Sequence, residues 1–89
     1  MPRYIVERTV GQLTHEQWED TARKAKSAIR ELDRGVVWVR SYISHAEGKV
    51  YCEYDAPSSE AVEELSRMAG LPIDQISEIS LEISPTMFV

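Results

Sequence analysis

The sequence contains almost no cysteine, no long apolar run and no excess of basic charge, and each absence excludes a class of protein. Cys52 is the single cysteine, so it has no partner for an internal disulfide, which fits a reducing cytoplasm. No segment approaches the roughly 18 consecutive apolar residues of a membrane span, and the N-terminus does not have the layout of a signal peptide. We therefore expect a cytoplasmic protein with no membrane partner.

The charge balance excludes a further class of protein. Ten Lys and Arg residues stand against 15 Asp and Glu residues, which gives a formal net charge of −5 and a pI of about 4.9. Proteins that bind the phosphate backbone of nucleic acids carry a basic patch or stripe, and this chain has none. We therefore expect no nucleic-acid partner; the acidic balance favours a cationic ligand or a metal instead.

The length of the chain predicts one domain, residues 1–89, with a thin core. A chain of this size buries only about 60–65% of the surface that it exposes when unfolded. With 43% apolar and 28% charged residues, the composition is that of a globular protein. Self-association is a common way for such a chain to cover more surface.

Alternation and helical spacing predict two strand–helix–strand units. Thr14 and Gln17 have the spacing of a helical capping box, and an apolar stripe follows at three- and four-residue steps. Gly35 is the expected left-handed cap of that helix. The expected segments are a strand over 4–8, a helix from Thr14 to 33–35, strands over 36–44 and 49–55, a helix capped by Ser58 or Ser59 that ends at Gly70, and a strand over 78–83.

This order, β-α-β-β-α-β, predicts an α+β ferredoxin-like fold. Its four-stranded antiparallel sheet has both helices on one face and leaves the other face open. Strand parity then assigns each side chain to a face. The expected inward residues are Tyr4, Val6, Val37, Val39, Ile43, Val50, Cys52, Tyr54, Ile79, Leu81 and Ile83.

The open face is where we expect a ligand or a partner to bind. It combines three carboxylates, one guanidinium and three aromatic rings, and exposed Trp and Tyr are enriched where a surface meets a partner. A dimer interface, a pocket within such an interface and an exposed face without a role all remain open. The predicted ligand-binding residues are Glu7, Trp38, Arg40, Tyr42, Tyr51, Glu53 and Glu82.

Metal and catalytic motifs are scarce. The candidate metal ligands are His45, Cys52 and Glu7, with His15 as a further nitrogen donor, but none has Cys-x-x-Cys or His-x-x-x-His spacing. A solvated histidine is common in a hairpin turn or a first helical turn, and a lone cysteine is most often a small buried apolar residue. No Ser-His-Asp arrangement, glycine-rich phosphate loop or redox pair is present.

Several stretches together resemble a known family. Val37-Trp38-Val39-Arg40-Ser41-Tyr42-Ile43 and the segment 49–57 are similar to a small bacterial family of ferredoxin-like proteins, described as a domain of unknown function, with a nickel-binding member. The similarity extends to residues 4–8, 69–72 and 76–79, and so covers nearly the whole chain. It implies a homodimer with facing sheets that binds nickel or another divalent ion. Family members commonly carry a histidine in the second helix, where this chain has Leu65.

Two functions of different classes follow from these features. The first is a non-enzymatic domain that binds a small ligand or a divalent metal such as nickel, acting as a homodimer with its site on the open sheet face. The alternative is a small dimeric α+β-barrel enzyme, of monooxygenase or isomerase type, acting on an aromatic or carbonyl substrate. An enzyme would require a titratable group with a shifted pKa inside a cavity.

Overall fold

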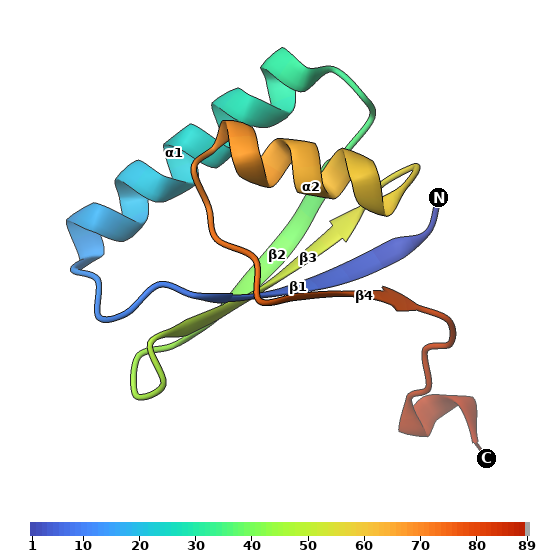
Figure 1. Ribbon diagram of the computed structural model, residues 1–89. Coiled ribbons are helices and arrows are strands. Elements are labelled where there is room, and N and C mark those ends of the chain that lie inside the picture. The colour runs from blue at the N-terminus through green and yellow to red at the C-terminus, as the bar shows by residue number, and fades with distance from the viewer. Residues whose placement is uncertain (89) are drawn as a thin grey trace.

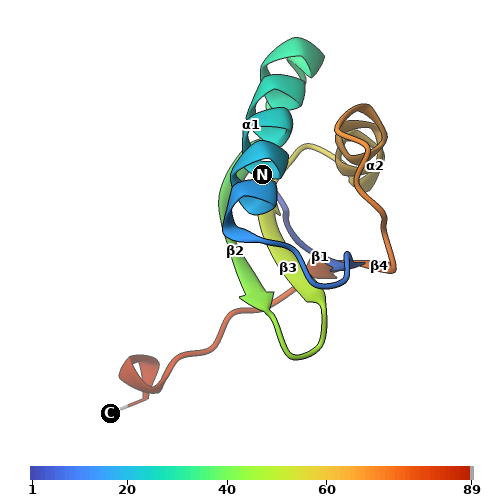
Figure 2. The same ribbon diagram turned by 90° about the vertical axis from the view of Figure 1, so that its left-hand side faces the viewer.

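The computed structural model describes residues 1–88; Val89, the last residue of the expected domain and of its apolar tail, lies outside the described residues. Four strands form one antiparallel sheet in the order β2-β3-β1-β4. Both helices cover the same face of this sheet, and its other face is open (Figures 1 and 2). The fold is therefore ferredoxin-like α+β, as the sequence predicts. The elements are β1 Arg3–Thr9, α1 His15–Leu32, β2 Val37–Ser44, β3 Lys49–Asp55, α2 Ser59–Met68, β4 Gln75–Ile79 and a short 3-10 helix, η1, Pro85–Met87.

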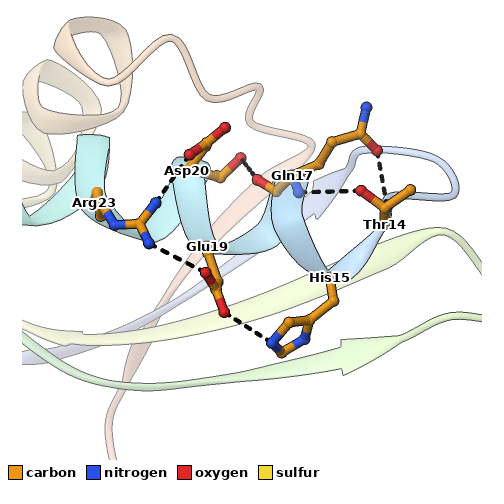
Figure 3. Close-up of polar contacts among 7 residues, drawn as sticks. Thr14, His15, Gln17, Glu19, Asp20 and Arg23 are labelled. Atoms are coloured by element: carbon orange, nitrogen blue, oxygen red, sulfur yellow. Dashed lines mark hydrogen bonds and ion pairs between the residues drawn. The ribbon is translucent and has the colours of Figure 1, made fainter.

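Helix α1 begins where the sequence predicts and ends two residues earlier than expected. The Thr14 side chain accepts a hydrogen bond from the backbone N–H of Gln17, and the Gln17 side chain accepts one from the backbone N–H of Thr14 (Figure 3). This capping box satisfies two of the free N–H groups at the helix start. The left-handed C-cap is Asp33, with φ 47°, rather than Gly35. Gly35 also has positive φ, but it lies in the loop that leads to β2.

The core lies between the sheet and the two helices. Helix α2 is capped by Ser58, whose side chain accepts a hydrogen bond from the backbone N–H of Ala61. One side of α2 is fully buried, including Val62 and Leu65. These residues pack against Tyr4 and Val6 of β1 and the inward residues of β3. No helix among residues 1–88 combines the length and the hydropathy needed to cross a bilayer.

A β-bulge in β2 changes the predicted parity of that strand. Trp38 pairs with Tyr54 and Arg40 pairs with Glu53, so Val39 is an extra residue without a partner on β3. Beyond the bulge the prediction is right: Arg40 and Tyr42 lie on the open face and Ile43 lies opposite the buried Val50.

Before the bulge, the predicted orientations are inverted. Val37 is 49% exposed and lies opposite Asp55, whereas Trp38 is half-buried and packs against the core. The predictions that Val37 points inward and that Trp38 lies on the open face are therefore wrong. An extra residue shifts a period-two pattern by one, which moves every earlier side chain to the other face.

The last strand lies earlier in the chain than the sequence analysis predicts. Strand β4 pairs with β1 so that Val6 lies opposite Ile76 and Arg3 lies opposite Ile79. Because Val6 is in the core, Ile76 is the inward residue of β4 and Ile79 is on the open face. The predicted inward positions of Ile79, Leu81 and Ile83 are wrong. The cause is local: the alternation of Ile79, Leu81 and Ile83 continues past the last residue that pairs with β1.

Residues 80–88 leave the sheet and extend away from it (Figures 1 and 2). Their apolar side chains are largely exposed; Leu81, for example, is 73% exposed. The other exposed apolar residues of this tail are Ile83, Met87 and Phe88.

Candidate functional site

The open face mixes aromatic and charged side chains. Tyr42 of β2 lies opposite Tyr51 of β3, and Tyr51 lies opposite Glu7 of β1. In the next row, Arg40 lies opposite Glu53, which in turn lies opposite Ile5. Tyr42 is 53% exposed although it is on a sheet face. Exposed aromatic rings among charged groups are typical of a surface that meets a partner.

Ion pairs join the charged residues of this face. The guanidinium of Arg3 contacts Glu53 at 2.9 Å and Asp55 at 2.9 Å, and Arg40 lies 3.6 Å from Glu53. The ammonium of Lys49 contacts Glu7 at 2.8 Å. The hydrogen bond from Arg3 holds the pKa of Asp55 below its usual value, and the hydrogen bond to Glu7 raises the pKa of Lys49. Asp55 and Lys49 are therefore charged and paired at neutral pH.

The four strands of this face carry balanced charge. Glu7, Glu53 and Asp55 are matched by equal numbers of cations, Arg3, Arg40 and Lys49. The chain as a whole has a formal net charge of −5, so the negative excess lies elsewhere. Two copies of an acidic chain repel one another at long range, and a neutral face is where that repulsion is weakest.

The structure brings together five of the seven predicted ligand-binding residues: Glu7, Arg40, Tyr42, Tyr51 and Glu53. Trp38 is on the helix side, for the reason given above. Glu82 lies in the tail beyond β4 rather than on the sheet. The pKa of Arg3 is raised chiefly by its hydrogen bond to Asp55, and the charge of Glu82 adds to this effect. The role of these residues in binding stays a prediction.

The three candidate metal ligands do not converge in one copy. Cys52 lies opposite the core residue Val6 and points toward the helices, whereas the neighbouring Glu7 is on the open face. His45 follows β2 in the turn before β3 and is exposed. Among residues 1–88, no three His, Cys, Asp or Glu side chains are grouped so that they could hold a metal ion. A single copy therefore does not fit the nickel site that the sequence resemblance implies.

The other histidine, His15, belongs to a network of polar contacts on the surface of α1. Its Nε2 lies 2.9 Å from Glu19, which also binds Arg23 at 3.1 Å (Figure 3). Arg23 in turn binds Asp20 at 2.9 Å. The His15 side chain is almost fully exposed. Its position fits a solvated residue of the first helical turn.

A second polar arrangement lies on the helix side of the sheet. The indole N–H of Trp38 donates to Ser41 Oγ at 2.9 Å, and the Ser41 hydroxyl donates to Cys52 Sγ at 3.2 Å. The bulge at Val39 permits this contact, because it places Trp38 and Ser41 on the same face although they are three residues apart. These groups line a cavity between α1 and the sheet.

Arg8 is the main residue of this region that the sequence analysis missed. It is 0% exposed, and its guanidinium donates to the backbone carbonyl of Pro72 at 2.9 Å and to the hydroxyl of Tyr54 at 3.1 Å. Burial raises the pKa of Tyr54 to about 12, so its hydroxyl is neutral at physiological pH. Strand alternation could have predicted its burial: with Tyr4 and Val6 inward, Arg8 lies on the same inward face of β1.

Comparisons with known proteins agree with this fold. A family model described as "Nickel responsive protein SCO4226-like" matches residues 4–79. The crystal structure of SCO4226 from Streptomyces coelicolor A3(2) superposes with a TM-score of 0.82 at 23% sequence identity, covering 91% of this chain and 99% of that one. At this identity the structural match establishes the fold alone. No curated protein matches the chain. The tail after β4 lies outside the region that the family model matches.

Proposed function

The chain belongs to the family of nickel-responsive SCO4226-like proteins, and on this basis we propose that it works as a non-enzymatic homodimer whose copies meet through their open sheet faces and hold a divalent metal between them. The resemblance to a small bacterial family, inferred from the sequence, is confirmed by the family match. A cytoplasmic location is part of the same proposal and is supported by the single cysteine.

The observation that carries the dimer is the balanced charge of the open face. Its ion pairs leave little net charge to oppose a second acidic copy, and the exposed ring of Tyr42 gains by being covered. Small domains of this size bury too little surface to leave such a face uncovered without cost.

We assign the metal to both copies together because residues 1–88 of one copy contain no converging donor set. Glu7 is the carboxylate of this face that can most easily exchange its cationic partner for a metal ion, since that partner is one partly exposed lysine. Glu53 is held by two arginines. An ammonium on a flexible stem is displaced more easily than planar guanidinium groups bound in a fixed geometry. We therefore assign Glu7, from both copies, as the first ligand to test.

The dimer is tested by analytical ultracentrifugation over a concentration series. The variant Glu53→Lys reverses one charge at the centre of the face, and its matched control, Glu63→Lys, makes the same change on the exposed side of α2. We expect Glu53→Lys to raise the dimer dissociation constant by about tenfold or more, because like charges across an interface cost several kcal/mol. We expect Glu63→Lys to leave it unchanged. Equal effects of the two variants, or a monomeric wild type at all concentrations, would contradict the proposed dimer.

The metal is tested separately by equilibrium dialysis with nickel, read by elemental analysis. Glu7→Gln removes the proposed ligand charge, whereas Lys49→Met frees Glu7 from its ion pair. We expect Glu7→Gln to lose bound nickel and Lys49→Met to bind it more tightly. If the wild type retains no nickel at micromolar concentration, the metal part of the proposal is wrong while the dimer can still stand.

A further inference from the structure

Exposed apolar side chains are concentrated in the tail, residues 80–88. Leu81, Ile83, Met87 and Phe88 are each between 59% and 73% exposed, and Glu82 is the one charged residue of this segment. Within residues 1–88, the hydrogen bonds of the tail join only residues of the tail itself. Contiguous apolar side chains in contact with water mark a surface that meets a partner. The tail therefore has the character of a contact segment that its own copy does not cover.

The tail leaves the sheet on the side of the open face. Both views show the helices on one side of the sheet and the tail on the other (Figures 1 and 2). Ile79, the last residue of β4, is on the open face opposite Arg3, the first residue of β1. Leu81 and Ile83 continue the alternation of Ile79, a pattern typical of a strand with one covered side. Because β1 begins at Arg3, no strand of the same copy lies beside them.

The sheet face alone is small for a stable interface. Neighbouring strands lie about 4.8 Å apart and rise about 3.3 Å per residue. The face of this four-stranded sheet, in which β1 has seven residues, therefore measures roughly 19 by 23 Å, or about 440 Å² in projection. A stable interface buries about 800 Å² on each partner. A dimer formed through this face needs further contact area, and the apolar tail beside the face can supply it.

The opposite corner of the same sheet carries an exposed valine. Val37, at the start of β2, is 49% exposed and lies opposite Asp55. Asp55 lies opposite Arg3, which in turn lies opposite Ile79. Val37 and Ile79 are therefore at opposite edges of one end of the open face. When two such sheets face each other about a two-fold axis parallel to their strands, the end of β4 in one copy meets the start of β2 in the other. This arrangement brings the tail to the second copy's Val37.

The charges at this end of the sheet do not oppose the contact. Asp55 is paired with Arg3 at 2.9 Å. The charge of Glu82 acts on the same guanidinium, since it adds to the effect of Asp55 in raising the pKa of Arg3. The one charge of the tail is thus balanced within its own copy. An apolar segment with little net charge can approach the neutral open face of a second acidic copy without strong repulsion.

We propose that the tail of each copy packs against the second copy, with Leu81 and Ile83 beside Val37 at the start of β2. This inference rests on the proposed open-face dimer and adds a second contact to it. It also sets the two-fold axis parallel to the strands. A two-fold dimer contains each contact twice, so both tails and both Val37 side chains take part.

Analytical ultracentrifugation of Leu81→Ser tests the contribution of the tail. Leu81 is 73% exposed in one copy, so the fold of that copy does not depend on it. We expect the dimer dissociation constant to rise by about tenfold or more, because an apolar side chain is lost from two symmetric contacts. The matched control, Met68→Ser, removes an exposed apolar side chain from α2 and should leave the constant unchanged. A dimer that Leu81→Ser leaves equally stable overturns the role of the tail but not the open-face dimer. A wild type that stays monomeric at all concentrations overturns both.

A mixture of isotope-labelled and unlabelled protein tests the contact itself, because isotope-filtered NMR spectra detect only contacts between chains. We expect nuclear Overhauser effects between the Leu81 methyl groups of one chain and the Val37 methyl groups of the other. A dimer in which the tail contacts only its own chain, or only the helices of the second copy, would overturn the proposal.

Discussion

Replacing Tyr54 by Phe tests whether Arg8 is held inside the protein as described. Tyr54 is 1% exposed, and its hydroxyl accepts a hydrogen bond from the Arg8 guanidinium at 3.1 Å. A buried hydrogen bond to a charged group contributes about 1.5–3 kcal/mol, and its loss leaves a buried donor without an acceptor. We therefore expect Tyr54→Phe to lower the free energy of unfolding by about 2 kcal/mol.

Thermal unfolding gives this prediction a large signal. In a domain of this size, 1 kcal/mol changes the midpoint by roughly 4–8 °C, so we expect a decrease of about 8–16 °C. Tyr42→Phe is the matched control, because Tyr42 is on the open face and more than half exposed. Its loss of stability should stay within about 0.5 kcal/mol. All variants are compared at one protein concentration, since the proposed dimer would make the midpoint depend on concentration.

A double-mutant cycle with Arg8→Met separates the hydrogen bond from the packing of the ring. If the two groups interact as described, Tyr54→Phe costs less in the Arg8→Met background, and the difference is the coupling energy. Equal losses for Tyr54→Phe and Tyr42→Phe, or a coupling energy near zero, would refute the placement of Arg8 against Tyr54.

Two further predictions address the hairpin and the pH dependence of stability. Gly48→Ala should destabilise the protein more than Gly70→Ala. Both glycines have φ near +67°, a conformation that costs an alanine about 1–2 kcal/mol. A Cβ at Gly48 would also lie 3.0 Å from the Gly11 backbone, whereas a Cβ at Gly70 has no atom within 4 Å. Urea unfolding of both variants measures the difference in the free energy of unfolding. Equal losses would contradict the close approach of Gly48, in the β2–β3 hairpin, to Gly11, in the loop before α1. Burial raises the pKa of Tyr54 to about 12 from roughly 10 in the unfolded chain, so the folded state holds this proton more tightly. The contribution of this proton to the free energy of unfolding is therefore fully present below about pH 10 and is lost as the pH rises toward 12. The free energy of unfolding of the wild type should fall more between pH 10 and 12 than that of Tyr54→Phe, and an equal fall in the two proteins would contradict this prediction.

Much of the fold was predictable because local patterns and tertiary packing agree. The capping box at Thr14, the hairpin between β2 and β3, and the alternation of Val50, Cys52 and Tyr54 all specify the structure that forms. Strand β3 has the predicted bounds, and its alternation assigns Tyr51 and Glu53 to the open face. In these segments one face is plainly apolar, so register and orientation follow from sequence.

The errors arose where an apolar pattern is ambiguous. Val36, Val37, Trp38 and Val39 are four apolar residues in succession, and such a run does not reveal where a bulge is inserted. Only the pairing with β3 identifies Val39 as the extra residue. At the other end of the sheet, alternation continues beyond the residues that pair with β1, so the predicted strand starts and ends too late.

The candidate site was predictable in part, for a related reason. The open-face charges follow from parity, but their ion pairs depend on strand order, which places Arg3 beside both Glu53 and Asp55. Arg8 escaped notice because a charged residue in a strand is normally exposed. Its burial depends on the Pro72 carbonyl and the Tyr54 hydroxyl, which come from distant parts of the chain.

A comparison of amide chemical shifts in dilute and concentrated protein tests most directly whether the open face pairs with a second copy. Pairing through the open face predicts concentration-dependent shifts at residues of that face, such as Ile5, Tyr51 and Glu53, with the amides of α1 and α2 unchanged. Shifts confined to the two helices, with those strand residues constant, would contradict it.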